Sequence, residues 1–432
     1  MPVRLSTREY GFEAGFRALL ESKRESAADV EAAVAAIIDD VARRGDAALI
    51  DHTRRFDRVD LKAAGLRLSS REIAEGAAAA PPETVAALRV AAGRIESFHR
   101  RQVPAPIDYV DACGVRLAQR WTPIAAAGLY VPGGTAAYPS SVLMNAVPAR
   151  VAGVERLVIA VPTPDGALNP LVLAAAQLLG IDEIYRIGGA QAIAALAYGT
   201  ATIAPVDKIV GPGNAYVAAA KRRVFGRVGI DMIAGPSEIL VVADRANDPR
   251  WIAADLLSQA EHDSAAQAIL LTDDAAFAAA VEAAIAGHLR ILPRAEIARA
   301  SWERHGAILL VGGFDEAPAL VDRLAPEHLE LALDEAEDLA ARIRHAGAIF
   351  LGRHTPEAIG DYIAGPNHVL PTARSARFAS GLGVVDFLKR SSLVRCEAAS
   401  LNALAPAAIR LAEAEGLSAH ALSLSIRLGA AG

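Results

Sequence analysis

RLVIAVP (156–162), EIYRIGG (183–189) and DKIVGPG (207–213) are three apolar stretches that each end in a proline or glycine turn. Each is followed by an alanine-rich helical pattern, over 170–179, 190–199 and 214–226. Strands that alternate with helices in this way form a parallel sheet with helices on its faces. These stretches therefore predict an α/β fold.

A second alternation of the same kind starts at IAGPSEILVVAD (233–244) and continues through AILLT (268–272) and AILLVG (307–312). Two strand series that each need a sheet imply two similar domains. Residues 1–24 are short and polar, whereas the chain beyond 380 ends in helical patterns, one of which we expect to begin at Pro406. The fold class we predict is α/β with two Rossmann-like parallel-sheet domains, a small N-terminal arm and a helical C-terminal tail.

Composition limits the classes of function. Hydrophobic residues make up 53% of the 432 residues, charged residues 22%, and the net charge is −6. No basic stripe with interleaved aromatic residues is present, so we expect no nucleic-acid partner. No apolar run has the form of a signal peptide or a bilayer span, so we expect a cytoplasmic protein. Cys113 and Cys396 lie far apart and have neither metal-binding nor redox spacing.

LLSQAEHD (256–263) is a polar interruption at the end of a helical pattern. Gln259 and His262 lie three residues apart, so they share one helix face. An amide oxygen and an imidazole nitrogen can form half of a metal site. The alternative interpretation is a helix cap beside an ordinary surface histidine.

Four further polar clusters interrupt the apolar chain. Glu327 and His328 precede a strand pattern and suit general acid–base chemistry. Asp361 is a candidate metal ligand, and His368 a candidate substrate contact. The remaining candidates are Ser237, Glu415 and His420. Taken singly, these residues also have structural interpretations, as a helix-entry charge, a turn former, a cap or a solvated helix residue.

A zinc site is one way to join these clusters. Because the chain has no usable cysteine pair, the ligands would have to be nitrogen and oxygen atoms. Gln259, His262, Asp361 and His420 would supply two imidazoles, one carboxylate and one amide. Such a site stays positively charged and can bind an alcohol oxygen or an amine.

Glycines stand at the strand ends of the first series, as Gly133-Gly134, Gly188-Gly189 and Gly211-Pro212-Gly213. Glycine at these positions lets a ligand approach the backbone, and the following helix N-termini favour phosphate. No GxGxxG fingerprint is present, so a dinucleotide would bind without it and weakly. Each glycine pair can also be a simple tight turn.

The chain resembles the histidinol dehydrogenase family along its whole length. The stretches that carry the resemblance are YVPGGTAAYPSSVLMNAVPA (130–149), RIGGAQAIAALAYGT (186–200), DKIVGPGNAYV (207–217), DMIAGPSEILVVAD (231–244), DLLSQAEHDSAAQAILLT (255–272), LAPEHLEL (324–331), GPNHVLPT (365–372) and EGLSAHALSLSIR (415–427).

The resemblance implies an enzyme of the last step of histidine biosynthesis, which oxidises L-histidinol through histidinaldehyde to L-histidine with zinc and two NAD. It implies an intertwined homodimer whose tail completes the partner's site. The zinc ligands would be Gln259, His262, Asp361 and His420, and Glu327 and His328 the catalytic pair. Substrate contacts would be Ser237, Glu415, His328 and the zinc ligands, and cofactor contacts Tyr130, Gln191 and Asn214.

On this basis we expect four segments. They are an arm over 1–24, an α/β domain with the zinc ligands over 25–129 and 237–381, a Rossmann-like NAD-binding domain over 130–236, and a dimerisation tail over 382–432.

The alternative function is that of a related zinc and NAD dehydrogenase of another small polar alcohol, such as a sulfonated diol. The EGLSAH motif favours histidinol, because Glu415 and His420 would serve its imidazole. A non-catalytic two-domain binder would leave the Glu327-His328 pair without a role.

Overall fold

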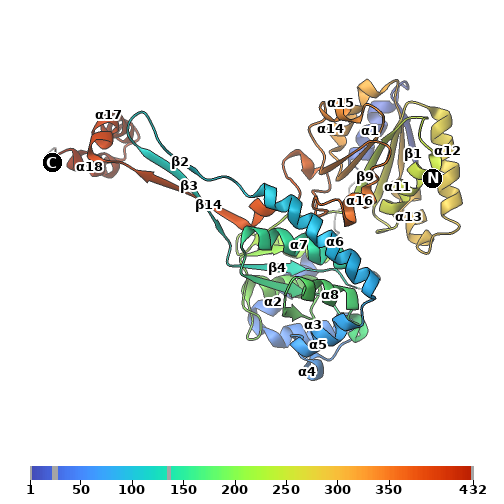
Figure 1. Cartoon of the computed structure of the whole chain (residues 1–432), viewed down its shortest axis with the longest axis horizontal. Coiled ribbons are helices and arrows are strands. Elements are labelled where there is room, and N and C mark those ends of the chain that lie inside the picture. The colour runs from blue at the N-terminus through green and yellow to red at the C-terminus, as the bar shows by residue number, and fades with distance from the viewer. Residues whose placement is uncertain (1, 22–27, 134–137, 430–432) are drawn as a thin grey trace. The chain divides into compact units, whose positions relative to one another are not determined.

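The computed structural model describes residues 2–21, 28–133 and 138–429, which form two compact units (Figure 1). The first unit contains residues 1–102 and 125–387, and the second contains 103–124 and 388–432. The first unit holds two parallel sheets, which confirms the predicted α/β class and both strand series.

The first parallel sheet has six strands in the order β1-β11-β10-β9-β12-β13. Ile239 and Val241 of β9 face one layer of helices, whereas Leu240 and Val242 face the other. Strands buried on both faces are typical of parallel sheets and explain the continuous apolar runs of the sequence. The strands are β1 (Val3–Ser6), β9 (Glu238–Ala243), β10 (Gln267–Thr272), β11 (Ala307–Leu310), β12 (His328–Ala332) and β13 (Ala348–Leu351).

Helices cover both faces of this six-stranded sheet. One layer consists of α11 (Pro249–Ala260), α12 (Ala275–His288) and α13 (Ala295–His305). The other consists of α1 (Phe12–Glu21), α14 (Ala317–Leu324) and α15 (Ala336–Ala340). The short helix α16 (Glu357–Tyr362) follows β13 and contacts α11.

The second parallel sheet has five strands in the order β6-β5-β4-β7-β8. They are β4 (Ala126–Tyr130), β5 (Arg156–Ala160), β6 (Glu183–Tyr185), β7 (Lys208–Val210) and β8 (Gly229–Ile230). The first strand, β4, lies in the middle, and the chain then adds strands on both sides of it. The carboxyl end of β4 is thus beside the switch point where such sheets bind ligands.

The helices of residues 28–57 pack against this second sheet. Val34 and Ile38 of α2 (Ala28–Arg44) share a core with Ile193 of α9 (Gly189–Tyr198) and Val217 of α10 (Ala215–Val224). Leu49 of α3 (Asp46–Asp57) belongs to the same core. The α/β domain expected over 25–129 and 237–381 would place these helices with the zinc ligands instead. An amphipathic helix shows which of its faces is buried but not which sheet buries it.

Five further helices belong to the first unit. They are α4 (Leu61–Ala64), α5 (Ser70–Ala78), α6 (Pro82–His99), α7 (Pro139–Ala152) and α8 (Pro170–Leu178). The last four of them contact one another in succession, α5 with α8, α8 with α7 and α7 with α6, and α7 also contacts β4.

The N-terminal stretch differs from the expected arm. Residues 3–6 form β1, an edge strand parallel to β11, with Val3 opposite Ala307. Phe16 of α1 is fully buried in the core of the same sheet. Residues 22–24 of the expected arm lie outside the described residues.

The second unit is an antiparallel sheet with two helices. The strand order is β14-β3-β2, with β2 (Ile107–Val110), β3 (Arg116–Pro123) and β14 (Leu388–Arg395). The helices are α17 (Ala398–Ala414) and α18 (Ser418–Ser425). The tail is therefore not wholly helical, because β14 pairs with a strand from much earlier in the chain. The prediction that a helix begins at Pro406 was wrong, since a capping box of Glu397 and Ser400 starts α17.

In the part of the chain that the structure describes, no helix is both long enough and apolar enough to cross a membrane.

Candidate active site

Most of the predicted site residues of the first unit lie at the amino ends of β9 and β12. Ser237 and Glu327 immediately precede these strands, and His328 begins β12. The strands are parallel neighbours with His328 opposite Ile239, so their first residues meet at one edge of the sheet. The end of α11 contributes Gln259 to the same edge.

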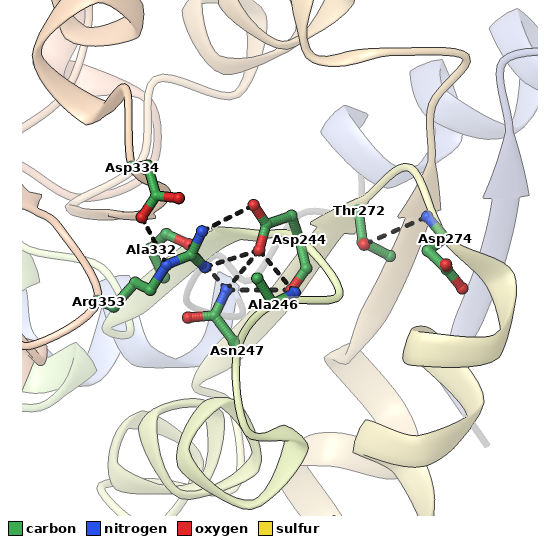
Figure 2. A network of polar contacts seen from close by, with 8 residues as sticks. All are labelled: Asp244, Ala246, Asn247, Thr272, Asp274, Ala332, Asp334 and Arg353. Atoms are coloured by element: carbon green, nitrogen blue, oxygen red, sulfur yellow. Dashed lines mark hydrogen bonds and ion pairs between the residues drawn. The ribbon is translucent and has the colours of Figure 1, made fainter.

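A network of polar contacts lies at the opposite edge of this sheet, as Figure 2 shows. Arg353 donates hydrogen bonds to both carboxylate oxygens of Asp244, at 2.6 and 2.9 Å, and to Asp334 at 3.0 Å. Arg353 and Asn247 also donate to the carbonyl oxygen of Ala332, at 3.1 and 2.8 Å. Ligands usually bind at the carboxyl ends of β9 and β12 in such sheets. Here an ion-pair network lies there, and the predicted site residues lie at the amino ends.

His328 is a buried imidazole whose two nitrogens have different surroundings. Nδ1 lies 3.0 Å from the carbonyl oxygen of Glu238, which can only accept a hydrogen bond. Nε2 lies 3.5 Å from Asp361 Oδ1 and has no hydrogen-bond partner among the described residues. Nδ1 also lies 3.1 Å from the amide nitrogen of Gln259. Nε2 could accept a proton from a substrate only in a neutral ring whose own proton is on Nδ1. Burial opposes a charge on His328, but Glu357, Glu327 and Asp361 together raise its pKa well above the ordinary value.

Glu327 is a buried carboxyl group beside this imidazole. Its Oε2 accepts a hydrogen bond from Glu238 N at 2.8 Å and lies 3.6 Å from His328 Nδ1. Burial raises the pKa of Glu327 to about 7, against the opposing charge of His328. A carboxyl group with a pKa near neutrality can both take up and release a proton, as general acid–base chemistry requires.

Gln259 and His262 lie at the end of α11, as predicted from LLSQAEHD. Gln259 is fully buried, and its amide is oriented with the nitrogen 3.0 Å from Glu357 Oε1. His262 follows the helix, and its carbonyl oxygen accepts a hydrogen bond from Arg294 at 3.3 Å. Burial lowers the pKa of His262, with Asp361 acting in the opposite direction. A neutral imidazole of this kind is a suitable metal ligand.

Asp361 joins these groups from α16. Burial opposes its ionisation, but His328, His368 and His262 outweigh this effect and lower the pKa of Asp361. Its carbonyl oxygen also lies 2.9 Å from His368 Nδ1. The side chain is therefore an anion held among three imidazoles.

The donor atoms at this edge fit a metal ion of the zinc type. An amide oxygen, an imidazole and a carboxylate are ligands that zinc accepts. One oxygen or nitrogen from each of His328, Glu357 and Asp361 also falls within 4.8 Å of the others, so a second donor set overlaps the predicted one at Asp361. Of the two His328 nitrogens, Nδ1 already contacts the carbonyl oxygen of Glu238.

Ser237, Glu415 and His420 complete the predicted set. Ser237 is half-buried, and its carbonyl oxygen accepts a hydrogen bond from Gln267 N at 3.0 Å. Glu415 is the C-cap of α17, and His420 lies in α18. Both belong to the second unit and are exposed there. The two units are described separately, so the roles of Glu415 and His420 stay predictions.

The predicted cofactor contacts lie on the second parallel sheet. Tyr130 ends β4 and is buried, and its hydroxyl accepts a hydrogen bond from Gly189 N at 3.0 Å. Burial raises the pKa of Tyr130 to about 12. Gln191 is buried in the first turn of α9, and Asn214 caps α10 by accepting from Tyr216 N and Val217 N at 3.1 and 3.2 Å.

The glycines near these residues allow close backbone packing. A Cβ atom at Gly188 would collide with Pro162, and one at Gly211 would collide with the backbone of Tyr130. Gly134 lies outside the described residues. The strand ends thus form an edge with little side-chain bulk, which is what a dinucleotide without the usual fingerprint would need.

Sequence reasoning missed two groups at the site. The carbonyl oxygen of Glu238 contacts His328, and no side-chain pattern could have indicated a backbone contact. Glu357 is a buried carboxyl group four residues before Asp361. That spacing places both on one helix face, so it was a usable signal.

Comparison with known proteins gives one family. The family model described as histidinol dehydrogenase matches residues 20–428. The chain is 68% identical to the histidinol dehydrogenase of Rhodospirillum rubrum over 99% of each chain. It is 64% identical to that of Nitrobacter winogradskyi, over 99% of this chain and 100% of the relative.

A solved structure agrees with these sequences. The crystal structure of histidinol dehydrogenase from Elizabethkingia anophelis superposes with a TM-score of 0.94 at 36% identity, over 99% of this chain and 98% of that chain. None of these matches supports the alternative of a dehydrogenase for another small polar alcohol.

Proposed function

This chain belongs to the histidinol dehydrogenase family, and we propose on that premise that it oxidises L-histidinol through histidinaldehyde to L-histidine with two NAD. The family makes it an NAD-dependent oxidoreductase. In the proposal it acts in the cytoplasm, at the last step of histidine biosynthesis.

In the proposed first step His328 takes the alcohol proton while hydride leaves the carbinol carbon for NAD. The support for this role is the difference between its two ring nitrogens. Nδ1 faces the carbonyl oxygen of Glu238 at 3.0 Å, and Nε2 is buried without a hydrogen-bond partner among the described residues. A substrate hydroxyl would supply the missing partner.

In the proposed second step Glu327 removes a proton from the water that adds to the aldehyde. The hydrate then loses hydride to a second NAD, which yields the carboxylate. Burial raises the pKa of Glu327 to about 7, so the group can accept that proton near neutral pH.

We propose zinc as the metal, held by Gln259, His262 and Asp361 together with His420 from the tail of a second copy of the chain. Zinc bound there would orient the substrate through its amine and imidazole. Ser237, His328 and Glu415 would contact the substrate beside the ligands. The support for this set is that His262 acts on the charge of Asp361 and that both Gln259 and Asp361 contact His328.

We propose that NAD contacts Tyr130, Gln191 and Asn214. Tyr130 ends β4, and Gln191 and Asn214 lie at the starts of the helices that follow β6 and β7, so all three lie near the carboxyl ends of a parallel sheet, where dinucleotides bind. Without a GxGxxG turn the site should bind NAD weakly. Weak binding suits the reaction, because the first NADH must leave while the aldehyde stays.

The observation that carries the proposal is the match of the family over residues 20–428 together with the buried Glu327-His328 pair. The test is NAD reduction by the purified, zinc-loaded protein with L-histidinol, before and after zinc is removed by a chelator. The proposal expects NADH formation that is lost with zinc and restored with it. No NADH from a folded, zinc-loaded protein would contradict it.

A further inference from the structure

Glu357 is a buried acidic residue that neither proposed reaction step uses. It is the first residue of α16 and is 2% exposed. Burying a carboxyl group is costly unless nearby groups compensate for it. Its partners therefore indicate what the group does.

One oxygen of Glu357 faces both the proposed metal site and the proposed base. Oε1 lies 3.0 Å from the amide nitrogen of Gln259 and 3.5 Å from His328 Nδ1. The other oxygen, Oε2, lies 3.3 Å from the hydroxyl of Ser258.

The contact with Gln259 decides which amide atom is free. A carboxylate or carbonyl oxygen in this position accepts a hydrogen bond, so the NH2 group of Gln259 must face Glu357. The carbonyl oxygen of Gln259 then points away from Glu357. That oxygen is the atom a metal would bind, because an amide nitrogen is not a zinc ligand.

The contact with His328 lies on the Nδ1 side of the imidazole. Nδ1 lies 3.0 Å from the carbonyl oxygen of Glu238, 3.1 Å from the amide nitrogen of Gln259, 3.5 Å from Glu357 and 3.6 Å from Glu327. Together these groups hold the ring in one orientation, with Nε2 on the side of Asp361. Partners of this kind orient metal ligands and bases in other enzymes.

The helix itself sets this geometry. Glu357 and Asp361 lie four residues apart, so they share one face of α16. Glu357 faces the Nδ1 side of His328, and Asp361 faces the Nε2 side at 3.5 Å. Phe350 stacks on the same imidazole, with ring centroids 6.1 Å apart, and a Cβ atom at Gly360 would collide with Phe350. The imidazole is therefore held on several sides.

We propose that Glu357 is a positioning residue that presents the carbonyl oxygen of Gln259 to the metal and holds the imidazole of His328, the proposed base, in place. The inference rests on the proposed function, because it assigns Gln259 and His328 those roles. It differs from a role for Glu357 as a metal ligand, which the cluster of His328, Glu357 and Asp361 would also permit.

Two variants of the full-length protein separate these roles. Glu357→Gln keeps an acceptor oxygen for Gln259 and can turn its own NH2 toward Ser258. This variant should therefore keep the amide of Gln259 in the same orientation. Glu357→Leu removes the acceptor at similar size. We expect Glu357→Leu to weaken zinc binding about 10- to 100-fold, as loss of a residue behind a ligand does. Glu357→Gln should stay within a few-fold of the parent.

Zinc affinity is measured by competition with a chromogenic chelator, which needs no substrate. At saturating zinc the kcat of Glu357→Leu should still be at least about tenfold lower, because the imidazole is no longer held in place. The KM for NAD should not change. Ser258→Ala is the matched control, since it removes the contact to Oε2, together with a hydrogen bond to the carbonyl oxygen of Asp255, and leaves Oε1 unchanged.

A second experiment tests whether Glu357 acts through Gln259. In a Gln259→Ala background, Glu357→Leu should cause no further loss of zinc affinity. An additional loss in that background, or equal zinc affinities for Glu357→Gln and Glu357→Leu, would overturn the proposal in favour of direct ligation. Unchanged zinc affinity and kcat in Glu357→Leu would overturn it as well. If Glu357→Leu fails to fold, Glu357→Ala removes the same acceptor.

A different measurement tests the proposed function, namely the oxidation of L-histidinol by the parent protein. A parent protein that binds zinc but does not oxidise L-histidinol would contradict the function, and the zinc affinities would still test the contact between Glu357 and Gln259. If the parent oxidises L-histidinol but Glu357→Leu has the same zinc affinity as the parent, only the positioning role would be contradicted.

Discussion

Breaking the buried ion pair of Lys221 and Asp231 should loosen the turn that precedes α10. The two side chains are 3% and 1% exposed. Lys221 Nζ donates to the carbonyl oxygen of Gly211 at 2.8 Å, and Asp231 Oδ2 accepts from Gly211 N at 2.8 Å. The pair therefore holds both backbone polar groups of Gly211. That glycine starts the turn leading to Asn214, a proposed NAD contact.

The magnitude follows from what each substitution leaves behind. Lys221→Met leaves a buried carboxylate without its counter-charge, which costs about 3–5 kcal/mol. Asp231 keeps hydrogen bonds from two backbone N–H groups, of Gly211 and Met232, so we expect a value near the lower end. Asp231→Leu should cost a similar amount, because it leaves the ammonium group of Lys221 buried and unpaired.

The assay is a double-mutant cycle on the free energy of unfolding in urea, with the KM for NAD measured in parallel. The double variant Lys221→Met/Asp231→Leu buries no unpaired charge, so it should lose much less stability than the sum of the two single variants. Each single variant should raise the KM for NAD. Additive losses, or a loss below about 1 kcal/mol in Lys221→Met, would refute the reasoning.

Three further predictions concern the two ends of the six-stranded sheet and the tail. Glu327→Gln should slow the oxidation of histidinaldehyde more than that of L-histidinol, as measured by NADH formation from each; an equal loss in both would argue against activation of water. His420→Asn should lower the zinc content of the protein. Mixing His420→Asn subunits with His262→Asn subunits should restore one intact site in each heterodimer. Verified heterodimers without activity would indicate that all ligands come from a single chain. Arg353→Lys loses the bidentate contact with Asp244, so it should lower the free energy of unfolding by about 1–3 kcal/mol and leave the zinc affinity unchanged. A fall in zinc affinity would mean that the network of Arg353 at the carboxyl ends of the strands belongs to the site.

The strands and the βα order could be predicted from the sequence because buried parallel strands are continuous apolar runs. Ile239 to Ala243 in β9 is buried on both faces, and its pattern was visible without a structure. The packing of Val34 and Ile38 against the second sheet could not be predicted, since their helix has the same apolar face wherever it packs. The pairing of β14 with β3 was missed because strands far apart in sequence give no local signal of their register.

The candidate site was predicted to a similar extent. Gln259, Glu327, His328 and Asp361 stood out as polar groups in an apolar chain, and the fold brings them to one edge of a sheet. Glu327 and His328 come directly before a strand pattern, which is consistent with their place at the amino end of β12. Acidic residues usually lie in solvent, so the burial of Glu357 could not be predicted from the sequence alone.

The most direct test of the account is the number of NADH molecules formed for each L-histidinol consumed by the zinc-loaded protein. Two successive oxidations at one site, with His328 and then Glu327 taking the protons, predict two NADH and L-histidine as the product. One NADH for each L-histidinol, with histidinaldehyde as the product, would contradict the account.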